Sequence, residues 1–183
     1  MERRDALRAL GAAAAFTLLP HTARAAWSAV AAAPGAPPRA LRDDRAALIG
    51  GLADAIIPRT DTPSATDVNV GAFIDVIVAE YYSDEERTAF LAGLDAIGAR
   101  ITSVGDASFA VMSPDAKRLL LDELDKPADR QAPEARAWSR LKGLVVHGYF
   151  TSEQVQKDVL KTVIMPGRFD GNAPMKVAGN ANG

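Results

Sequence analysis

The sequence predicts an all-α fold, a small bundle of about five helices with an extended N-terminal arm and an irregular C-terminal tail. Three observations support this prediction. Apolar residues recur three or four positions apart in several segments between residues 43 and 147. Start and stop signals for helices flank most of these segments. Beyond residue 25, no segment of useful length alternates polar and apolar residues with the period of a strand.

Residues 1–25 have the composition of an export leader. Arginines near the start precede the apolar stretch Ala9–Leu19, which is too short to span a bilayer as a helix. Ala23-Arg24-Ala25 has the small-x-small form that signal peptidase accepts. We therefore expect these residues to direct export rather than to contribute to the fold.

The adjacent pair Arg3 and Arg4, with Leu7 at the apolar position that follows, resembles a twin-arginine signal. Because that pathway exports folded proteins, the expected location of the protein is the periplasm. An ordinary secretory signal or an uncleaved anchor is the alternative interpretation. Arg3 and Arg4 are thus the predicted export-signal residues.

The remainder of the chain divides into three expected parts. Residues 26–40 are rich in Ala and Pro, which predicts an extended linker or an arm that orders only on a partner. A helical domain is expected over residues 41–152 and a C-terminal tail over residues 153–183. The expected helices run from about Asp43 to Ile57, from Gly71 to Tyr82, from Asp84 through Ile101, from Pro114 to just before Pro127, and from Pro133 to His147.

Local signals mark the ends of these helices. Ser83 with Glu86 forms a capping box, in which each residue satisfies a free amide of the other. Ser113 before Pro114 places a capping residue ahead of the residue type favoured in the first turn. At the other ends, Pro58 stops the first expected helix, and Gly148 is expected to end the last one.

The composition excludes several classes of protein. A net charge of −2 and a pI near 5.7 argue against nucleic-acid binding, which needs a basic surface. The chain has no cysteine, which excludes disulfides, thiolate zinc sites, iron–sulfur clusters and covalently attached haem. It has only 2 histidines, too few for a multi-histidine metal site.

The sequence contains no recognisable catalytic centre. The only histidine beyond residue 25 is His147, at an expected helix end, where it would cap carbonyls or interact with the helix dipole. Gly50-Gly51 lies inside an expected helix and predicts close packing rather than a nucleotide-binding loop. We expect no catalytic, cofactor-binding or metal-binding residues in this chain. An acidic run is expected to be a solvated helix face: Asp115, Asp122, Glu123 and Asp125.

Two segments near the C-terminus carry the residue types enriched in protein interfaces. Tyr149 and Phe150 come directly after the expected helix stop. Pro166-Gly167-Arg168-Phe169-Asp170 is a turn-forming segment that presents an arginine and a phenylalanine. The alternative is that Phe150 and Phe169 cover the core of the domain.

Short motifs along the chain resemble those of a known family. Asp54-Ala55-Ile56-Ile57-Pro58, Thr60-Asp61-Thr62-Pro63 and Phe73-Ile74-Asp75 are similar to the opening pattern of the gluconate 2-dehydrogenase subunit 3 family. Gly148–Ser152 and Pro166–Gly171 are similar to its closing pattern, in the same order. A twin-arginine leader is also typical of the family. The chain departs from some members directly after this last motif, where it has an asparagine and they have a cysteine.

The resemblance implies a non-catalytic small subunit of a periplasmic or membrane-associated, FAD-dependent dehydrogenase acting on a sugar, a sugar acid or a glycoside. The catalytic partner would be a flavoprotein of the glucose–methanol–choline (GMC) oxidoreductase type, which holds the FAD. In some complexes a cytochrome c subunit with haem c accepts the electrons. The small subunit would support folding of the flavoprotein and supply its export signal, with no cofactor and no membrane span of its own beyond residue 25.

The residues expected to contact this partner come from the loop after the first expected helix, the adjacent Tyr149 and Phe150, and the C-terminal tail. They are Pro58, Asp61, Thr62, Pro63, Tyr149, Phe150, Pro166, Gly167, Arg168, Phe169 and Asp170. Two other interpretations stay open. One is an enzyme in its own right, with carboxylate chemistry in a cleft around Asp61 or Asp75. The other is a free-standing periplasmic helical protein without an obligate partner.

Overall fold

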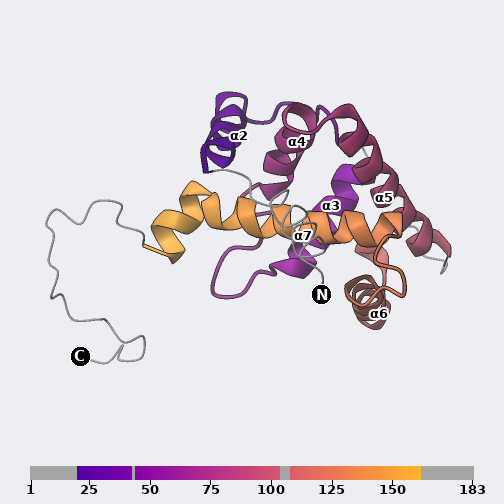
Figure 1. Ribbon diagram of the computed structural model, residues 1–183. Helices are drawn as coiled ribbons and strands as arrows, with labels where there is room; N and C mark the ends of the chain where they lie inside the picture. Colours follow the sequence, from indigo (N-terminus) through magenta and orange to yellow (C-terminus); the bar gives the residue numbers. More distant parts are fainter. Residues whose placement is uncertain (1–19, 43, 104–107, 162–183) are drawn as a thin grey trace, which may run out of the picture.

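The computed structural model describes residues 20–42, 44–103 and 108–161, and helices dominate this part of the chain (Figure 1). None of these residues lies in a strand, which confirms the all-α prediction. The elements are α2 (Pro20–Ala32), α3 (Asp44–Ile56), α4 (Val70–Glu80), α5 (Asp84–Ser103), the 3-10 helix η1 (Phe109–Val111), α6 (Pro114–Asp125), α7 (Pro133–Thr151) and the π-helical segment η2 (Val155–Val159).

The predicted start signals of α5 and α6 are confirmed. The amide of Ser83 donates to the Glu86 carboxylate at 3.1 Å, and the amide of Glu86 donates to the Ser83 hydroxyl at 3.2 Å. At the start of α6, the Ser113 hydroxyl accepts from the amide of Ala116 at 3.2 Å. Side chains thus satisfy amides that have no partner within the helix, and both helices begin where the sequence places them.

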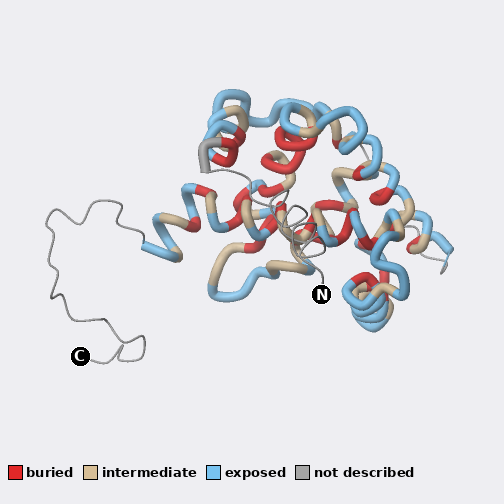
Figure 2. The backbone as a smooth tube through the Cα atoms, viewed as in Figure 1, coloured by how far each residue is buried: buried red, intermediate tan, exposed pale blue. Residues whose placement is uncertain are grey.

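Helix α7 is the central element of the fold, and it packs against each of the other described α-helices. In Figure 1 it crosses the middle of the molecule, with α5 along its N-terminal half and α2 above its C-terminal end. Helix α4 supplies the most deeply buried face. Phe73, Ile74 and Ile77 have no accessible surface, and buried segments of α4 and α7 face one another in Figure 2. One continuous apolar core therefore joins the bundle.

The N-terminal arm differs from the sequence prediction. An extended segment was expected over residues 26–40, but α2 continues to Ala32 and only residues 33–42 are irregular. Alanine has the highest helix propensity, so an alanine-rich stretch becomes helical when it has a surface to pack on. Ala23 and Ala26 are 2% and 0% exposed, because their small side chains let α2 lie close to α4 and α7.

The end of α7 also differs from the prediction. Gly148 does not end the helix, which continues to Thr151 and stops at Ser152. The reason for the glycine is packing, since a Cβ at this position would lie 2.7 Å from Cδ1 of Phe73. Tyr149 and Phe150 consequently lie in the last helical turn rather than after it. The expected tail begins with η2, whose Val155 is completely buried, so this part of the tail belongs to the bundle.

Candidate functional site

The loop between α3 and α4 is held in one shape by carboxylates near its two ends. Asp54 accepts from the amide of Thr66 at 2.9 Å and from its hydroxyl at 2.7 Å. Asp67 accepts from the amide of Ser64 at 2.8 Å and forms an ion pair with Arg59. Charge-assisted bonds at both ends give the loop a defined conformation before any partner binds.

The tip of this loop is exposed and is shaped by its own polar groups. The Thr60 hydroxyl donates to the Asp61 carboxylate at 2.9 Å, and the Thr60 amide donates to the carbonyl of Thr62 at 3.1 Å. Pro58 and Asp61 are exposed, while Thr62 and Pro63 are half-buried. The first four predicted interface residues therefore lie together on one rigid, solvent-facing turn.

Tyr149 connects this loop to the C-terminal end of α7. Its hydroxyl donates to the carbonyl of Pro63 at 2.8 Å, and its side chain is only 3% exposed. Phe150 packs edge-on against Tyr149 with ring centroids 5.3 Å apart, and it is 45% exposed. The two predicted interface segments, 86 positions apart in the sequence, are thus neighbours in the fold. Tyr149 is a buried connection between them and is not itself a surface contact.

We call the exposed part of this region the loop–α7 surface, comprising Pro58, Asp61, Thr62, Pro63 and Phe150. Val146, one turn before Phe150 on α7, is 43% exposed and extends its apolar part. The sequence analysis did not include Val146, although its i, i+4 spacing from Phe150 could have indicated it. The remaining predicted contacts, Pro166 to Asp170, lie outside the described residues.

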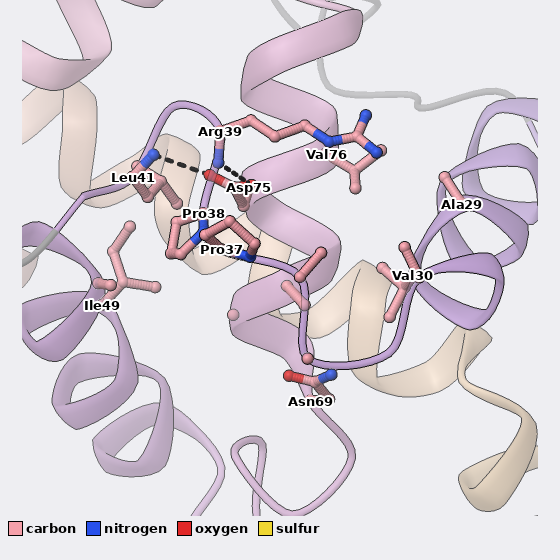
Figure 3. A pocket seen from close by; sticks show the side chains of 16 residues that line it. Ala29, Val30, Pro37, Pro38, Arg39, Leu41, Ile49, Asn69, Asp75 and Val76 are labelled. Atoms are coloured by element: carbon pink, nitrogen blue, oxygen red, sulfur yellow. Dashed lines mark hydrogen bonds between the residues drawn. The ribbon is translucent and has the colours of Figure 1, made fainter.

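Asp75 fastens the irregular arm to α4. It is 7% exposed, and its oxygens accept from the amides of Arg39, Ala40 and Leu41 at 2.8, 2.9 and 2.8 Å. Figure 3 shows the carboxylate pointing at the arm, beside a hollow of about 290 Å³. Both oxygens are occupied by backbone donors, so Asp75 has a structural role that the sequence analysis did not foresee. Asp61 lies at the exposed loop tip instead, hydrogen-bonded to Thr60.

A larger hollow of about 670 Å³ lies between α5, the α6–α7 connection and α7. Four of the charged groups that line it are paired: Glu86 with Arg140, and Asp125 with Lys142. Arg140 donates to the Tyr82 hydroxyl at 2.9 Å and to Glu86 at 3.0 Å. A hydrogen bond from Lys142, reinforced by one from the indole of Trp138, lowers the pKa of Asp125. Burial raises the pKa of Tyr82. These contacts hold α5, α6 and α7 together.

His147 does not cap the end of α7, contrary to the sequence-based expectation, because the helix continues for another turn. Its ring lies 6.2 Å from that of Phe73. Its Nε2 is buried and has no hydrogen-bond partner in the described part of the chain. Burial lowers the pKa of His147, which favours the neutral imidazole.

The acidic run on α6 is a solvated face, as predicted, and its carboxylates also form ion pairs. Arg118 lies 3.7 Å from Asp115 and 3.9 Å from Asp122, and Arg100 of α5 pairs with Glu123. Within residues 20–42, 44–103 and 108–161, no group of three or more His, Cys, Asp or Glu side chains is arranged to hold a metal ion. None of the helices in these ranges is long and apolar enough to cross a membrane.

The chain matches the model of a known protein family over most of its length. The family model described as gluconate 2-dehydrogenase subunit 3 matches residues 43–167. The chain belongs to this family. Neither a curated protein nor a solved structure matches it significantly. The gluconate 2-dehydrogenase subunit 3 match begins at the start of α3, so α2 and the whole arm lie outside it.

Family membership implies that the chain is the small subunit of a dehydrogenase complex, with a partner dehydrogenase subunit. The motifs that suggested the gluconate 2-dehydrogenase subunit 3 family have clear structural roles here. Asp54 holds the loop, Phe73 packs under Gly148, and Asp75 holds the arm. These residues hold irregular segments of the chain and pack α4 against α7.

Proposed function

We propose that this chain is the non-catalytic small subunit of a periplasmic or membrane-associated, FAD-dependent dehydrogenase of the GMC type. The complex would oxidise a sugar, a sugar acid or a glycoside. In this proposal the small subunit supports folding and stability of the catalytic flavoprotein and carries it across the membrane by the twin-arginine pathway. FAD belongs to the catalytic subunit, and haem c to a cytochrome subunit where one is present.

The observation that carries this proposal is the loop–α7 surface. It combines a preformed turn with an exposed aromatic ring, which is the arrangement that loses little entropy when a partner binds. The turn is fixed by Asp54, Asp67 and Tyr149, so its shape does not depend on the partner. Phe150 offers an exposed apolar ring beside Tyr149, the residue that is hydrogen-bonded to this turn.

The chemistry of the described residues supports an accessory role. The glycines Gly50 and Gly51 lie within α3, and a Cβ at Gly51 would lie 2.8 Å from Cδ1 of Phe109. Gly51 serves close packing, as predicted, and neither glycine lies in a turn after a strand, where a dinucleotide would bind. The carboxylate of Asp75 is occupied by the arm. These observations support the proposal that FAD is held by the partner subunit.

The test is a co-purification of the tagged small subunit with its flavoprotein. Replacing Phe150 by serine should lower the affinity by tens to hundreds of fold, the effect of losing about 2–4 kcal/mol at an interface centre. Leu119→Ser is the matched control, because Leu119 is 56% exposed on α6, outside the loop–α7 surface. This control should co-purify like the wild type.

Far-ultraviolet circular dichroism of both variants separates binding from folding. Unchanged helicity with lost flavoprotein would support the proposed interface. Equal recovery of the flavoprotein by the Phe150→Ser and Leu119→Ser variants would refute the loop–α7 surface as the contact. If the wild type captures no flavoprotein at all, the free-standing periplasmic protein becomes the better description.

A further inference from the structure

Helix α2 is an integral part of the folded domain, although it begins within the predicted export leader. Thr22, Ala23 and Ala26 are 9%, 2% and 0% exposed. This part of α2 packs on α4 and α7, and Figure 1 shows α2 beside α4 and above the C-terminal end of α7. The bond between Ala25 and Ala26, at which the small-x-small motif places cleavage, is therefore inside a packed helix.

Trp27 fastens α2 to both neighbouring helices. Its ring stacks on Phe73 of α4, with centroids 5.1 Å apart and an interplanar angle of 27°. Its indole N–H donates to the hydroxyl of Thr151 at the end of α7, at 3.1 Å. A stacked pair of rings stabilises such a contact beyond the apolar area that it buries. Trp27 lies only two positions beyond Ala25, so it holds the region of the cleavage site directly.

The chain that follows α2 is fixed as well. The amides of Arg39, Ala40 and Leu41 all donate to Asp75, and Leu41 is 2% exposed. Figure 3 shows the arm running from Val30 past Pro37 and Pro38 to this carboxylate. The segment from Thr22 to Leu41 is thus anchored at both of its ends.

A protease acts on backbone that has left its helix, so cleavage within a packed element requires local unfolding first. The motif residues Ala23 and Ala25 would have to leave the helix for the enzyme to bind them. This step is unfavourable, because it exposes Ala23 and Ala26 to water and separates Trp27 from Phe73. A protein that crosses the membrane already folded would present the site in this packed state.

We propose that the Ala25–Ala26 bond is a conditional processing site, which is hydrolysed only while α2 is detached from α4 and α7. Docked α2 keeps the leader attached to the folded chain. Hydrolysis consumes one water and leaves a carboxylate on Ala25 and an amine on Ala26. This inference rests on the proposed function, in which residues 1–25 are an export leader.

Cleavage would also change the domain itself. It would leave residues 26–32 of α2, a segment too short to be helical without strong packing. The buried contacts of Thr22 and Ala23 would be lost. The processed chain should therefore melt at a lower temperature than the unprocessed chain, which gives a second readout.

The experiment incubates the purified, full-length folded chain with signal peptidase in detergent micelles and follows the intact mass over time. Wild type should keep its full mass. Trp27→Ala should be cut between Ala25 and Ala26 at least tenfold faster, since both contacts of the indole are removed. Ser28→Ala is the matched control, because Ser28 is exposed on the same helix and should behave like the wild type.

Thr151→Val provides a milder variant in case Trp27→Ala disturbs the whole fold. It keeps the shape of the side chain but removes the acceptor for Trp27, and it should be cut faster than Ser28→Ala. Circular dichroism checks that each variant is folded. Wild type cut as fast as Trp27→Ala would overturn the proposal, as would resistance of all variants, including Thr151→Val. The assay contains no export step, so its result is independent of whether the twin-arginine route is correct.

Discussion

At the scale of single residues, a few polar and aromatic side chains fix the irregular segments of this protein to its helices. Asp54 and Asp67 fix the α3–α4 loop, and Asp75 fixes the arm. Tyr149 and Trp27 each combine a buried ring with one hydrogen bond to a distant segment. Buried carboxylates need such donors, because an unpaired charge in the core is costly. The sequence marks Asp54, Asp75 and Tyr149 as motif members, but only the fold shows what each one holds.

Among the residues that the structure describes, the buried Nε2 of His147 has no such partner, and this leads to a prediction about pH. Burial lowers its pKa below the ordinary value of about 6.5, so the unfolded chain binds the proton first as the pH falls. The free energy of unfolding should therefore decrease as the pH falls from about 7 to the lower pKa that His147 has in the folded chain. Replacing His147 by leucine removes the titration, so the variant should lose less stability than the wild type between pH 7.5 and 5.5.

Urea unfolding at several pH values measures this difference. His21 is present in both proteins and cancels in the comparison. The carboxyls of Glu86 and Asp125, whose pKa values are lowered by their partners, lose their stabilising contribution only at more acidic pH. Parallel stability curves for wild type and His147→Leu would show that this histidine does not titrate with folding.

At the scale of helices, close approach between α5 and α7 is set by one glycine. A Cβ on Gly93 would lie 2.5 Å from both the Cβ of Ala137 and the carbonyl oxygen of Pro133. Backbone atoms of the first turn of α7 cannot move aside cheaply, so the helices would have to separate. Gly93 therefore permits the contact on which the central helix pair depends.

Gly93→Ala should lower the free energy of unfolding by about 1–3 kcal/mol, the usual cost of overpacking a core. Gly98→Ala is the control on the same helix, because a Cβ there meets nothing within 4 Å. It should raise stability by up to about 1 kcal/mol through helix propensity alone. Chemical denaturation of both variants measures these free energies of unfolding. Equal effects of the two substitutions would contradict the assigned role of Gly93.

The sequence predicts some elements better than others for physical reasons. The starts of α5 and α6 depend on local capping residues, so they could be predicted from Ser83, Glu86 and Ser113 alone. The end of α7 could not be predicted in this way, because Gly148 is required for close packing against the ring of Phe73 on another helix. Helix α2 was missed because its stability comes from Trp27 and two buried alanines rather than from a periodic apolar stripe.

At the scale of the whole molecule, the bundle joins the candidate partner surface to α2, the helix that begins within the proposed leader. Helix α7 carries Phe150 of the loop–α7 surface, and its last turn also holds Trp27 of α2 through Thr151. The chain segment that follows the proposed leader is thus packed on the helix that presents the proposed partner contact. A catalytic subunit bound at that surface would travel as cargo of the same leader.

This arrangement predicts that both proteins depend on Arg3 and Arg4 for export. The general secretory route threads unfolded chains, so a flavoprotein that has already folded around FAD can cross only with a twin-arginine carrier. Arg3→Lys together with Arg4→Lys keeps the positive charge but removes the paired guanidinium groups. Both subunits should then accumulate in the cytoplasm, as measured by fractionation and by dehydrogenase activity in the periplasm.

Arg8→Lys is the matched control for this experiment, because Arg8 lies in the same charged region but outside the arginine pair. It should leave export of both subunits unchanged.

Combining the export assay with the Phe150→Ser variant separates the two proposed roles, since that chain should reach the periplasm while its flavoprotein stays behind. A flavoprotein that still reaches the periplasm in the double-lysine variant would show that it has its own route, and the carrier role would have to be abandoned.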